Sequence, residues 1–331
     1  MPERLRGELD ERLAMASRAL SYHQSFLQDY LRGILPYDLV ILSAPTGLGK
    51  TELALWIASC NARLNKRVHY FALEAEPREL ERRRKYAIVS RLAYRDKHPD
   101  ASTLSYTDWL MGNCEHIVGA YNAMADAEIA QQFFTLNTFY RGSNFTAETL
   151  SREISRVADA TDLIVVDHLH YIDDDGDRDE QRALGDAVKT IRDVALLIGK
   201  PIILVAHLRK KDRRFRQLIA ELDDVHGSSN VTKISTQVIT IERATDIDPS
   251  AWYMSPTYVA ILKDRRAGAP RVVAVQEFDT RTKIYAAHYT LGRVKGAKWE
   301  QIGMGDVPRW ALHHRPMVDG EASRQEEMRA T

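Results

Sequence analysis

The sequence predicts an α/β protein with a mostly parallel sheet and helices on both faces of that sheet. Short runs of apolar residues recur along the chain, and amphipathic helical patterns separate several of them. Strands that are apolar on both faces belong to a sheet that is covered on both sides. The last runs are joined by short turns at 266–270 and 280–282, which predicts an antiparallel extension of the sheet.

The individual elements follow in chain order. Residues 8–32 predict one helical arm with a narrow apolar stripe, which packs either on its own domain or on a neighbouring subunit. Strands are expected at 38–44, 68–73, 163–166, 202–206, 238–241, 259–262 and 272–275. The clearest helix, at 183–198, ends before Gly199 and Pro201, and residues 86–132 predict a helical insertion. We therefore expect an arm at 1–35, an α/β domain at 36–290 and a tail of mixed order at 291–331.

The composition excludes several classes of protein. Of the 331 residues, 44% are hydrophobic and 28% are charged, which excludes a disordered chain and a collagen-like repeat. No stretch reaches the ~18 apolar residues that a membrane-spanning helix needs, and the N-terminus lacks the apolar core of a signal peptide. We expect a cytoplasmic protein without a membrane partner, acting in the host cytoplasm if a virus encodes it. The 46 basic and 46 acidic residues balance, so any nucleic acid must be bound by local patches.

A phosphate-binding loop follows the first expected strand. Residues 44–51 are Ala44, Pro45, Thr46, Gly47, Leu48, Gly49, Lys50 and Thr51, and a helical pattern begins at their end. In such a P-loop the backbone N–H groups and the helix N-terminus hold the phosphates of ATP, with the Lys50 ammonium at the β- and γ-phosphates. The Thr51 hydroxyl is expected on Mg²⁺. Ala44 stands where the motif has its first glycine, and a glycine-rich turn without a ligand is the alternative interpretation.

Three further candidate residues lie at the ends of expected strands. Asp167 ends an apolar strand, which is the position of a carboxylate that holds Mg²⁺. Glu74 is a candidate general base that polarises the attacking water, with Glu76 and a plain helix-capping role as alternatives. His207 is a candidate contact to the γ-phosphate, and a structural histidine at a strand end is its alternative.

Several motifs carry a resemblance to a known family. They are Phe71-Ala72-Leu73-Glu74 with Leu80 and Arg83, Asp167-His168-Leu169, His207-Leu208-Arg209-Lys210, Asp224-Val225-His226-Gly227-Ser228-Ser229 with Ile239-Thr240-Ile241-Glu242-Arg243, and Lys263-Asp264-Arg265-Arg266-Ala267-Gly268. With the P-loop, and in this order, they resemble the hexameric replicative helicases of the DnaB type, a branch of the RecA-like ATPases. The nearest similarity is to the phage primase-helicase and mitochondrial Twinkle branch, for its helicase part only, and it covers residues 36–290.

The resemblance implies a RecA-like P-loop ATPase core with ATP and Mg²⁺ as cofactors. It implies His207 as the γ-phosphate sensor, and P-loops of this family often begin with alanine, as Ala44 does here. In the family, the lysine and arginine of the last motif reach the neighbouring subunit's γ-phosphate, so Lys263 and Arg265 are expected to act in trans, Arg265 as an arginine finger. The implied partners are further copies of the chain in a ring that is expected to be hexameric, single-stranded DNA, and a primase or a loader.

Departures from the family concern the expected contacts with DNA. His226 and Ser229 replace an arginine and a glycine, and the run 173–180, where a channel loop is expected, is acidic and would repel phosphates. A basic run supplies the candidate DNA-binding residues, which are Arg209, Lys210, Lys211, Arg213 and Arg214. A solvated loop without DNA contact is the alternative for both runs.

The sequence therefore predicts an ATP-dependent, ring-shaped DNA helicase that translocates on single-stranded DNA. One alternative is a RecA-like ATPase that acts as a recombinase, a protein remodeller or a nucleotide switch, which the acidic run, His226 and the neutral net charge favour. Another is a non-catalytic module that holds ATP as a structural ligand. The presence of Lys50, Asp167 and Glu74 speaks against this last alternative.

Overall fold

The structure, a computed structural model, describes residues 2–76, 78–133, 135–142, 145–172, 180–208, 218–225, 228–296 and 298–311. Its helices are α1 (Pro2–Ser17), α2 (Ser25–Leu31), α3 (Lys50–Arg63), α4 (Glu79–Arg95), α5 (Tyr106–Leu110), α6 (Glu115–Gln131), α7 (Ala147–Val157), α8 (Glu180–Ile198) and α9 (Ser228–Ile234). Its strands are β1 (Leu39–Ala44), β2 (Val68–Ala72), β3 (Leu136–Tyr140), β4 (Leu163–Asp167), β5 (Ile202–His207), β6 (Gln237–Arg243), β7 (Met254–Asp264), β8 (Val273–Asp279), β9 (Ile284–Tyr285), β10 (Thr290–Lys295) and β11 (Lys298–Gln301).

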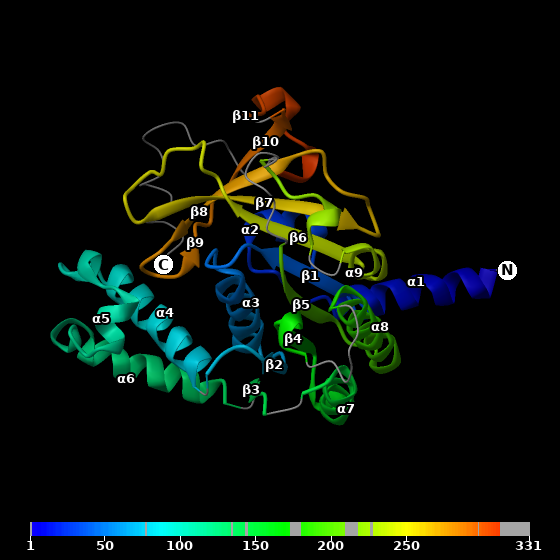
Figure 1. Ribbon diagram of the computed structural model, residues 1–331, viewed down its shortest axis with the longest axis horizontal. Helices are drawn as coiled ribbons and strands as arrows, with labels where there is room; N and C mark the ends of the chain where they lie inside the picture. Colours follow the sequence, from blue (N-terminus) through cyan, green and yellow to red (C-terminus); the bar gives the residue numbers. More distant parts are fainter. Residues whose placement is uncertain are drawn as a thin grey trace.

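One mixed sheet runs through the molecule (Figure 1). The strand order is β11-β10-β8-β7-β6-β1-β5-β4-β2-β3, and β9 pairs with β8. The strands from β6 to β3 in this order are parallel, whereas β7, β8, β10 and β11 extend the sheet in antiparallel fashion. This confirms the predicted α/β class with its antiparallel extension, and it places the carboxyl ends of β1, β5, β4 and β2 on one edge of the sheet.

Helices cover both faces of the parallel part. In β1, Val40 and Leu42 pack into a core that includes residues of α2 and α3. Leu39 and Ile41, which point the other way because side chains alternate along a strand, pack into a second core with residues of α7 and α8. All residues of β1 are buried. The continuous apolar runs of the sequence are therefore explained by a sheet that is shielded from water on both sides.

The N-terminal segment differs from the single helix predicted over 8–32. The chain forms α1 and α2 with a break between them, where His23 has a positive φ of 50° and Leu20 exchanges backbone hydrogen bonds of 2.9 and 2.8 Å with Ile34. Tyr22 and Phe26 are fully buried in the core, and the Tyr22 hydroxyl donates to the Gln237 side chain. Burial of these large side chains against the sheet outweighs continuation of the helix, since each aromatic buries a large apolar surface.

The two halves of the apolar stripe predicted over residues 8–32 therefore have different surroundings. Leu27 is buried within the chain's own core, which agrees with the interpretation that the stripe packs on its own domain. Leu9 and Leu13 of α1 are 48% and 59% exposed, and α1 projects from the body of the molecule (Figure 1).

The helical insertion predicted at 86–132 is present as α4, α5 and α6. These helices share a separate small core that includes Val89 and Val118. The sequence pattern does not predict β3, a short edge strand whose side chains are mostly half-exposed, nor α7 after it. Strands β10 and β11 lie in the tail that was expected to be of mixed order. In the described part of the chain, every helix is too short or too polar to cross a membrane.

The buried position of α2 predicts a large loss of stability for Phe26→Ala. Removing this fully buried ring leaves a cavity under the sheet and is expected to cost about 3–5 kcal/mol in the free energy of unfolding. Phe133→Ala removes a ring that is 70% exposed and is expected to change it by less than about 0.5 kcal/mol. Urea denaturation of both variants measures the difference, and equal midpoints would contradict the packing described here.

Candidate functional site

The P-loop joins β1 to α3 at the carboxyl edge of the sheet. Gly47 and Gly49 have φ values of 82° and 77°, which glycine adopts without the steric cost that other residues have. Gly49 is the N-cap of α3, so the first N–H groups of this helix face the loop. Lys50 is only 6% exposed, and burial lowers the pKa of its ammonium, against the charges of Glu74 and Asp167. The loop thus offers backbone donors and a largely desolvated cation to an anion.

A cavity of about 550 Å³ lies at this loop. Its lining includes Lys50, Thr51, Glu74 and Asp167, together with the alternative base Glu76. Candidate residues from three separate segments of the sequence therefore meet in one cavity. The volume is in the range of pockets that hold a small organic ligand.

Asp167 is held at the end of β4 with one oxygen engaged and the other unpartnered. Its Oδ2 accepts a 2.8 Å hydrogen bond from the Tyr70 hydroxyl, whereas its buried Oδ1 accepts none from the described residues. Burial raises the pKa of Asp167, opposed by the hydroxyl groups of Tyr70 and Thr51 and by the charge of Lys50. A buried carboxylate oxygen without a donor, beside a threonine hydroxyl, is a fitting pair of oxygen ligands for Mg²⁺.

Glu74, His168 and His207 form a row at the ends of β2, β4 and β5. The Glu74 side chain is 43% exposed, and its Oε2 lies 2.8 Å from Nε2 of His168, whose side chain is 1% exposed. The rings of His168 and His207 are 4.3 Å apart between centroids. Burial, reinforced by the charges of His207, Lys50 and His170, lowers the pKa of His168 to about 2, so this ring is neutral. His207 is the register partner of Ala44, which places it beside the start of the P-loop.

A salt-bridge network connects the start of α3 with α4. Arg83 lies 2.8 Å from Glu52 and 2.6 Å from Glu79, measured between nitrogen and oxygen atoms. Burial opposes the charge of Arg83, but the two carboxylates raise the pKa of its guanidinium above the ordinary value. All three residues line the cavity, so the insertion is fixed to the P-loop helix at the site itself.

The structure adds residues to the site that no motif of the sequence marks. Phe278 and Lys283, on either side of the turn between β8 and β9, line the cavity. The Phe278 ring lies 4.9 Å from that of Tyr285 between centroids, and both approach Gly49 closely enough that a Cβ there would be 3.5 Å from each. The turn at 280–282 was recognised from the sequence. Its contact with the P-loop depends on tertiary structure and leaves no local signal.

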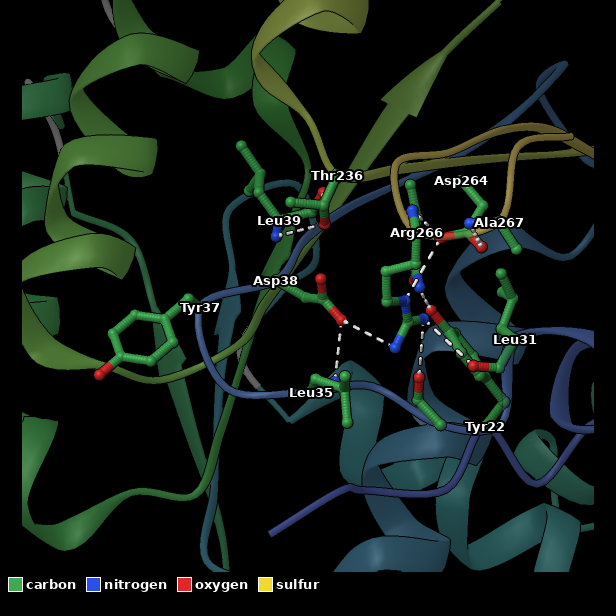
Figure 2. A network of polar contacts seen from close by, with 12 residues as sticks. Tyr22, Leu31, Leu35, Tyr37, Asp38, Leu39, Thr236, Asp264, Arg266 and Ala267 are labelled. Carbon is green, nitrogen blue, oxygen red and sulfur yellow. Dashed lines mark hydrogen bonds and ion pairs between the residues drawn. The ribbon is translucent and has the colours of Figure 1, made fainter. Parts of the chain in front are cut away.

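The arginine hairpin, residues 263–268, is anchored at the opposite end of β1 (Figure 2). The Arg266 guanidinium donates to the backbone oxygens of Leu31 and Gly33 at 3.1 and 3.2 Å. It also contacts the Asp264 carboxylate at 3.4 Å and lies 4.0 Å from Asp38. Burial raises the pKa of Asp38, against a hydrogen bond from the Leu35 backbone and the charge of Arg266. Arg266 is thus committed to contacts within its own chain.

Arg265 and Lys263 have different surroundings in this hairpin. The Arg265 side chain is exposed and forms no hydrogen bond or ion pair with the residues that the structure describes. Its backbone N–H donates to the carbonyl oxygen of Thr236. The Lys263 ammonium donates to the carbonyl oxygens of Thr232, Lys233 and Ser235 at the end of α9, at 2.5, 3.0 and 2.7 Å. The hairpin lies level with the first residues of β1, with the start of β6 between them. The P-loop follows the last residue of β1, ~20 Å away for six residues in a strand. The structure therefore does not bring Arg265 to the P-loop of its own chain.

The candidate DNA-binding residues lie outside the described part of the chain. This applies to Arg209, Lys210, Lys211, Arg213 and Arg214. It also applies to residues 173–179 of the acidic run and to His226. The described residues beside them, Leu208 and Val225, pair as an isolated antiparallel bridge at the end of β5.

Comparisons with known proteins agree with this fold. Among solved structures, the chain is similar to a DnaB-like replicative helicase studied with its interactions with primase, at 14% identity and a TM-score of 0.65 over 81% of this chain and 61% of that one. It is similar to a second solved structure, an ATPase domain (14% identity, TM-score 0.67, 89% and 99% covered). It is also similar to the KaiC-like protein PH0186 from the hyperthermophilic archaeon Pyrococcus horikoshii OT3 (17% identity, TM-score 0.53, 81% and 98% covered).

At these identities the structural matches show the fold alone, which is RecA-like, and the chain spans 61% of the length of the replicative helicase. A comparison with curated proteins gives no match. The family model of the DnaB-like helicase C-terminal domain matches residues 20–285. Because this match covers most of the chain and includes the P-loop, Glu74, Asp167, His207 and the arginine hairpin, the chain belongs to the DnaB-like helicase C-terminal domain family.

Proposed function

We propose that this chain is the motor of a replicative DNA helicase, in which a ring of copies hydrolyses ATP between subunits, moves along single-stranded DNA and unwinds duplex. The family assignment supports a helicase motor, and the cavity at the P-loop supports nucleotide binding. We further propose the division into an arm at 1–35, an ATPase domain at 36–290 and a tail at 291–331. A cytoplasmic location is part of the proposal.

One half of the proposed reaction site belongs to a single subunit. The P-loop and Lys50 bind the triphosphate, and Thr51 and Asp167 hold Mg²⁺, which neutralises charge on the phosphates when bound. Glu74 orients the attacking water and takes its proton, with Glu76 in the same cavity as the alternative base. His207, beside Ala44, contacts the γ-phosphate. The meeting of these groups at one edge of the sheet supports their assigned roles.

The other half comes from a neighbouring subunit, and the position of Arg265 carries this part of the proposal. An exposed guanidinium at the far end of β1 cannot stabilise charge on its own subunit's nucleotide, whereas in a ring it faces the next subunit. We propose Lys263 as a second group acting in trans. Its ammonium has to leave the carbonyl oxygens at the end of α9 to reach a phosphate.

The proposed partners follow from the same assembly. The exposed Leu9 and Leu13 of α1 support an arm that docks on an adjacent copy in a hexameric ring. Single-stranded DNA is the proposed polymer substrate, contacted by Arg209, Lys210, Lys211, Arg213 and Arg214. A primase is a proposed partner, since a relative of the same fold interacts with one, and a loader is another.

A second candidate function is a recombinase, protein remodeller or nucleotide switch built on the same ATPase core. The acidic run at 173–180, His226 and the zero formal net charge favour this alternative, because each weakens attraction to phosphates. It shares the nucleotide chemistry with the helicase and differs in the absence of DNA-stimulated turnover and unwinding.

The P-loop assignment predicts that Lys50→Ala abolishes ATP binding. The variant removes the one buried ammonium of the loop, while Lys66→Ala removes a lysine beyond the other end of α3 and should leave the affinity unchanged. Titration with a fluorescent ATP analogue in the presence of Mg²⁺ measures both. Unchanged affinity in Lys50→Ala would show that the loop has been misassigned.

The trans role predicts that Arg265→Ala leaves ATP binding intact and lowers turnover by a factor on the order of 10³. Mixing mutant and wild-type subunits should then inhibit hydrolysis more than in proportion, because each mutant subunit disables its neighbour's site. Arg271→Ala is the matched control, because Arg271 is an exposed arginine in the same connection between β7 and β8. A strictly linear loss of activity with mutant fraction would remove the intersubunit proposal.

The helicase proposal predicts ATP turnover that single-stranded DNA stimulates, together with displacement of a strand from forked DNA. Because phosphate contacts release counterions, the stimulation should weaken steeply between about 50 and 200 mM salt. ATPase rates with and without DNA, combined with the mass from light scattering in the presence of nucleotide, provide the measurement. A nucleotide-dependent oligomer without DNA stimulation would favour the remodeller or switch.

A further inference from the structure

His168 occupies a place that the sheet order determines. It directly follows β4, which lies between β5 and β2 in the sheet. The residue after β4 therefore lies between His207 at the end of β5 and Glu74 after β2. The contacts agree, since His168 is 2.8 Å from Glu74 on one side and 4.3 Å, between ring centroids, from His207 on the other.

The two side chains of this contact, His168 and Glu74, differ in exposure. The His168 side chain is 1% exposed, whereas the Glu74 side chain is 43% exposed. A half-exposed glutamate has several rotamers open to it, and fixing one of them costs side-chain entropy. A buried imidazole at hydrogen-bonding distance offers a fixed point for the carboxylate.

The proton of the His168 ring is placed by the turn that follows it. Nδ1 of His168 accepts a 3.3 Å hydrogen bond from the backbone N–H of His170, as the N-cap of the short helix Leu169–Tyr171. A ring nitrogen that accepts carries no proton, so the proton of the neutral ring is on Nε2, the atom that faces Glu74. The imidazole therefore presents an N–H donor to the carboxylate.

From this geometry we propose that His168 is a positioning residue for Glu74, a role that rests on the proposed function of Glu74 as the base. The Nε2–H donates to Oε2 and leaves the second carboxylate oxygen to accept from the attacking water. In the structure Nε2 and Oε2 are close but not aligned as a hydrogen bond. Such bonds often align only once the substrate is bound, and rotation of the exposed glutamate suffices.

A metal site is the competing interpretation of the same three residues. The nearest ligand atoms of Glu74, His168 and His207 lie within 4.8 Å of one another, and two histidines with a glutamate suit zinc. A metal on Nε2 requires the proton on Nδ1, where it would face the His170 N–H that Nδ1 now accepts. The backbone of the turn thus favours the hydrogen-bonding role.

The test uses the full chain and a double-mutant cycle with Glu74→Gln. His168→Leu removes the donor at similar volume, whereas His168→Gln keeps an N–H near the position of Nε2. We expect His168→Leu to lower kcat about 10-fold or more with KM and nucleotide affinity unchanged, and His168→Gln to retain most of the rate. In the Glu74→Gln background, His168→Leu should have no further effect, because the group on which it acts is already disabled.

Separate outcomes overturn the two proposals. Equal loss in both His168 variants, a parallel loss of nucleotide affinity, or full additivity with Glu74→Gln would overturn the positioning role alone. Wild-type turnover in Glu74→Gln would overturn the base assignment and, with it, this role. If the buried substitutions prevent folding, ¹⁵N shifts of labelled histidine in the unaltered chain report the tautomer, and a proton on Nδ1 of His168 would contradict the proposal.

Discussion

Parallel hydrogen bonding between β1 and β5, and between β4 and its two neighbours, is the constraint on which the site depends. It brings the ends of four strands to one edge, although the residues that follow them are distant in sequence. Register completes the alignment, with Ala44 beside His207 and Ala72 beside Asp167. Because side chains alternate along a strand, a shift of one residue in β4 would turn Asp167 to the opposite face and remove it from the cavity. The two apolar cores on either side of the sheet make such a shift costly, since it would move Val166 and Ile164 out of the core in which they pack.

Strand β1 also separates the two halves of the proposed reaction site. The P-loop follows the last residue of β1, and the arginine hairpin is fixed beside its first residues through Arg266. With every residue of β1 buried, the strand is a rigid spacer between the two ends. Each subunit of the proposed ring then takes part in two sites at a fixed separation. In the proposed ring, a change in the contact of Arg265 with one nucleotide would therefore be transmitted as a rigid-body movement of the P-loop that holds the next one.

Residues whose position depends on local pattern were predicted from the sequence, and those whose position depends on tertiary contact were not. The apolar strands and the P-loop have strong local signals, whereas the carboxylates at strand ends gain significance only from the P-loop before them. All of them lie at the expected places in the fold. The break of the predicted N-terminal helix at His23 was missed because its cause, the packing of Phe26 under the sheet, involves distant residues. The position of Phe278 in the cavity was not predicted for the same reason. The sequence also could not separate the outward Arg265 from the anchoring Arg266, because adjacent arginines differ only in what surrounds them.

Burial of opposite charges explains why this cavity suits a magnesium-bound triphosphate. Burial lowers the pKa of Lys50 and raises that of Asp167, so each group is displaced toward its neutral form. Their mutual attraction only partly offsets the loss of water, and Oδ1 of Asp167 accepts no hydrogen bond from the described residues. A phosphate beside Lys50 and a divalent cation beside Asp167 would supply both missing partners at once. The free-energy cost of removing Lys50 and Asp167 from water arises during folding and not during binding. The attraction of these two groups to the ligand would therefore contribute directly to the affinity.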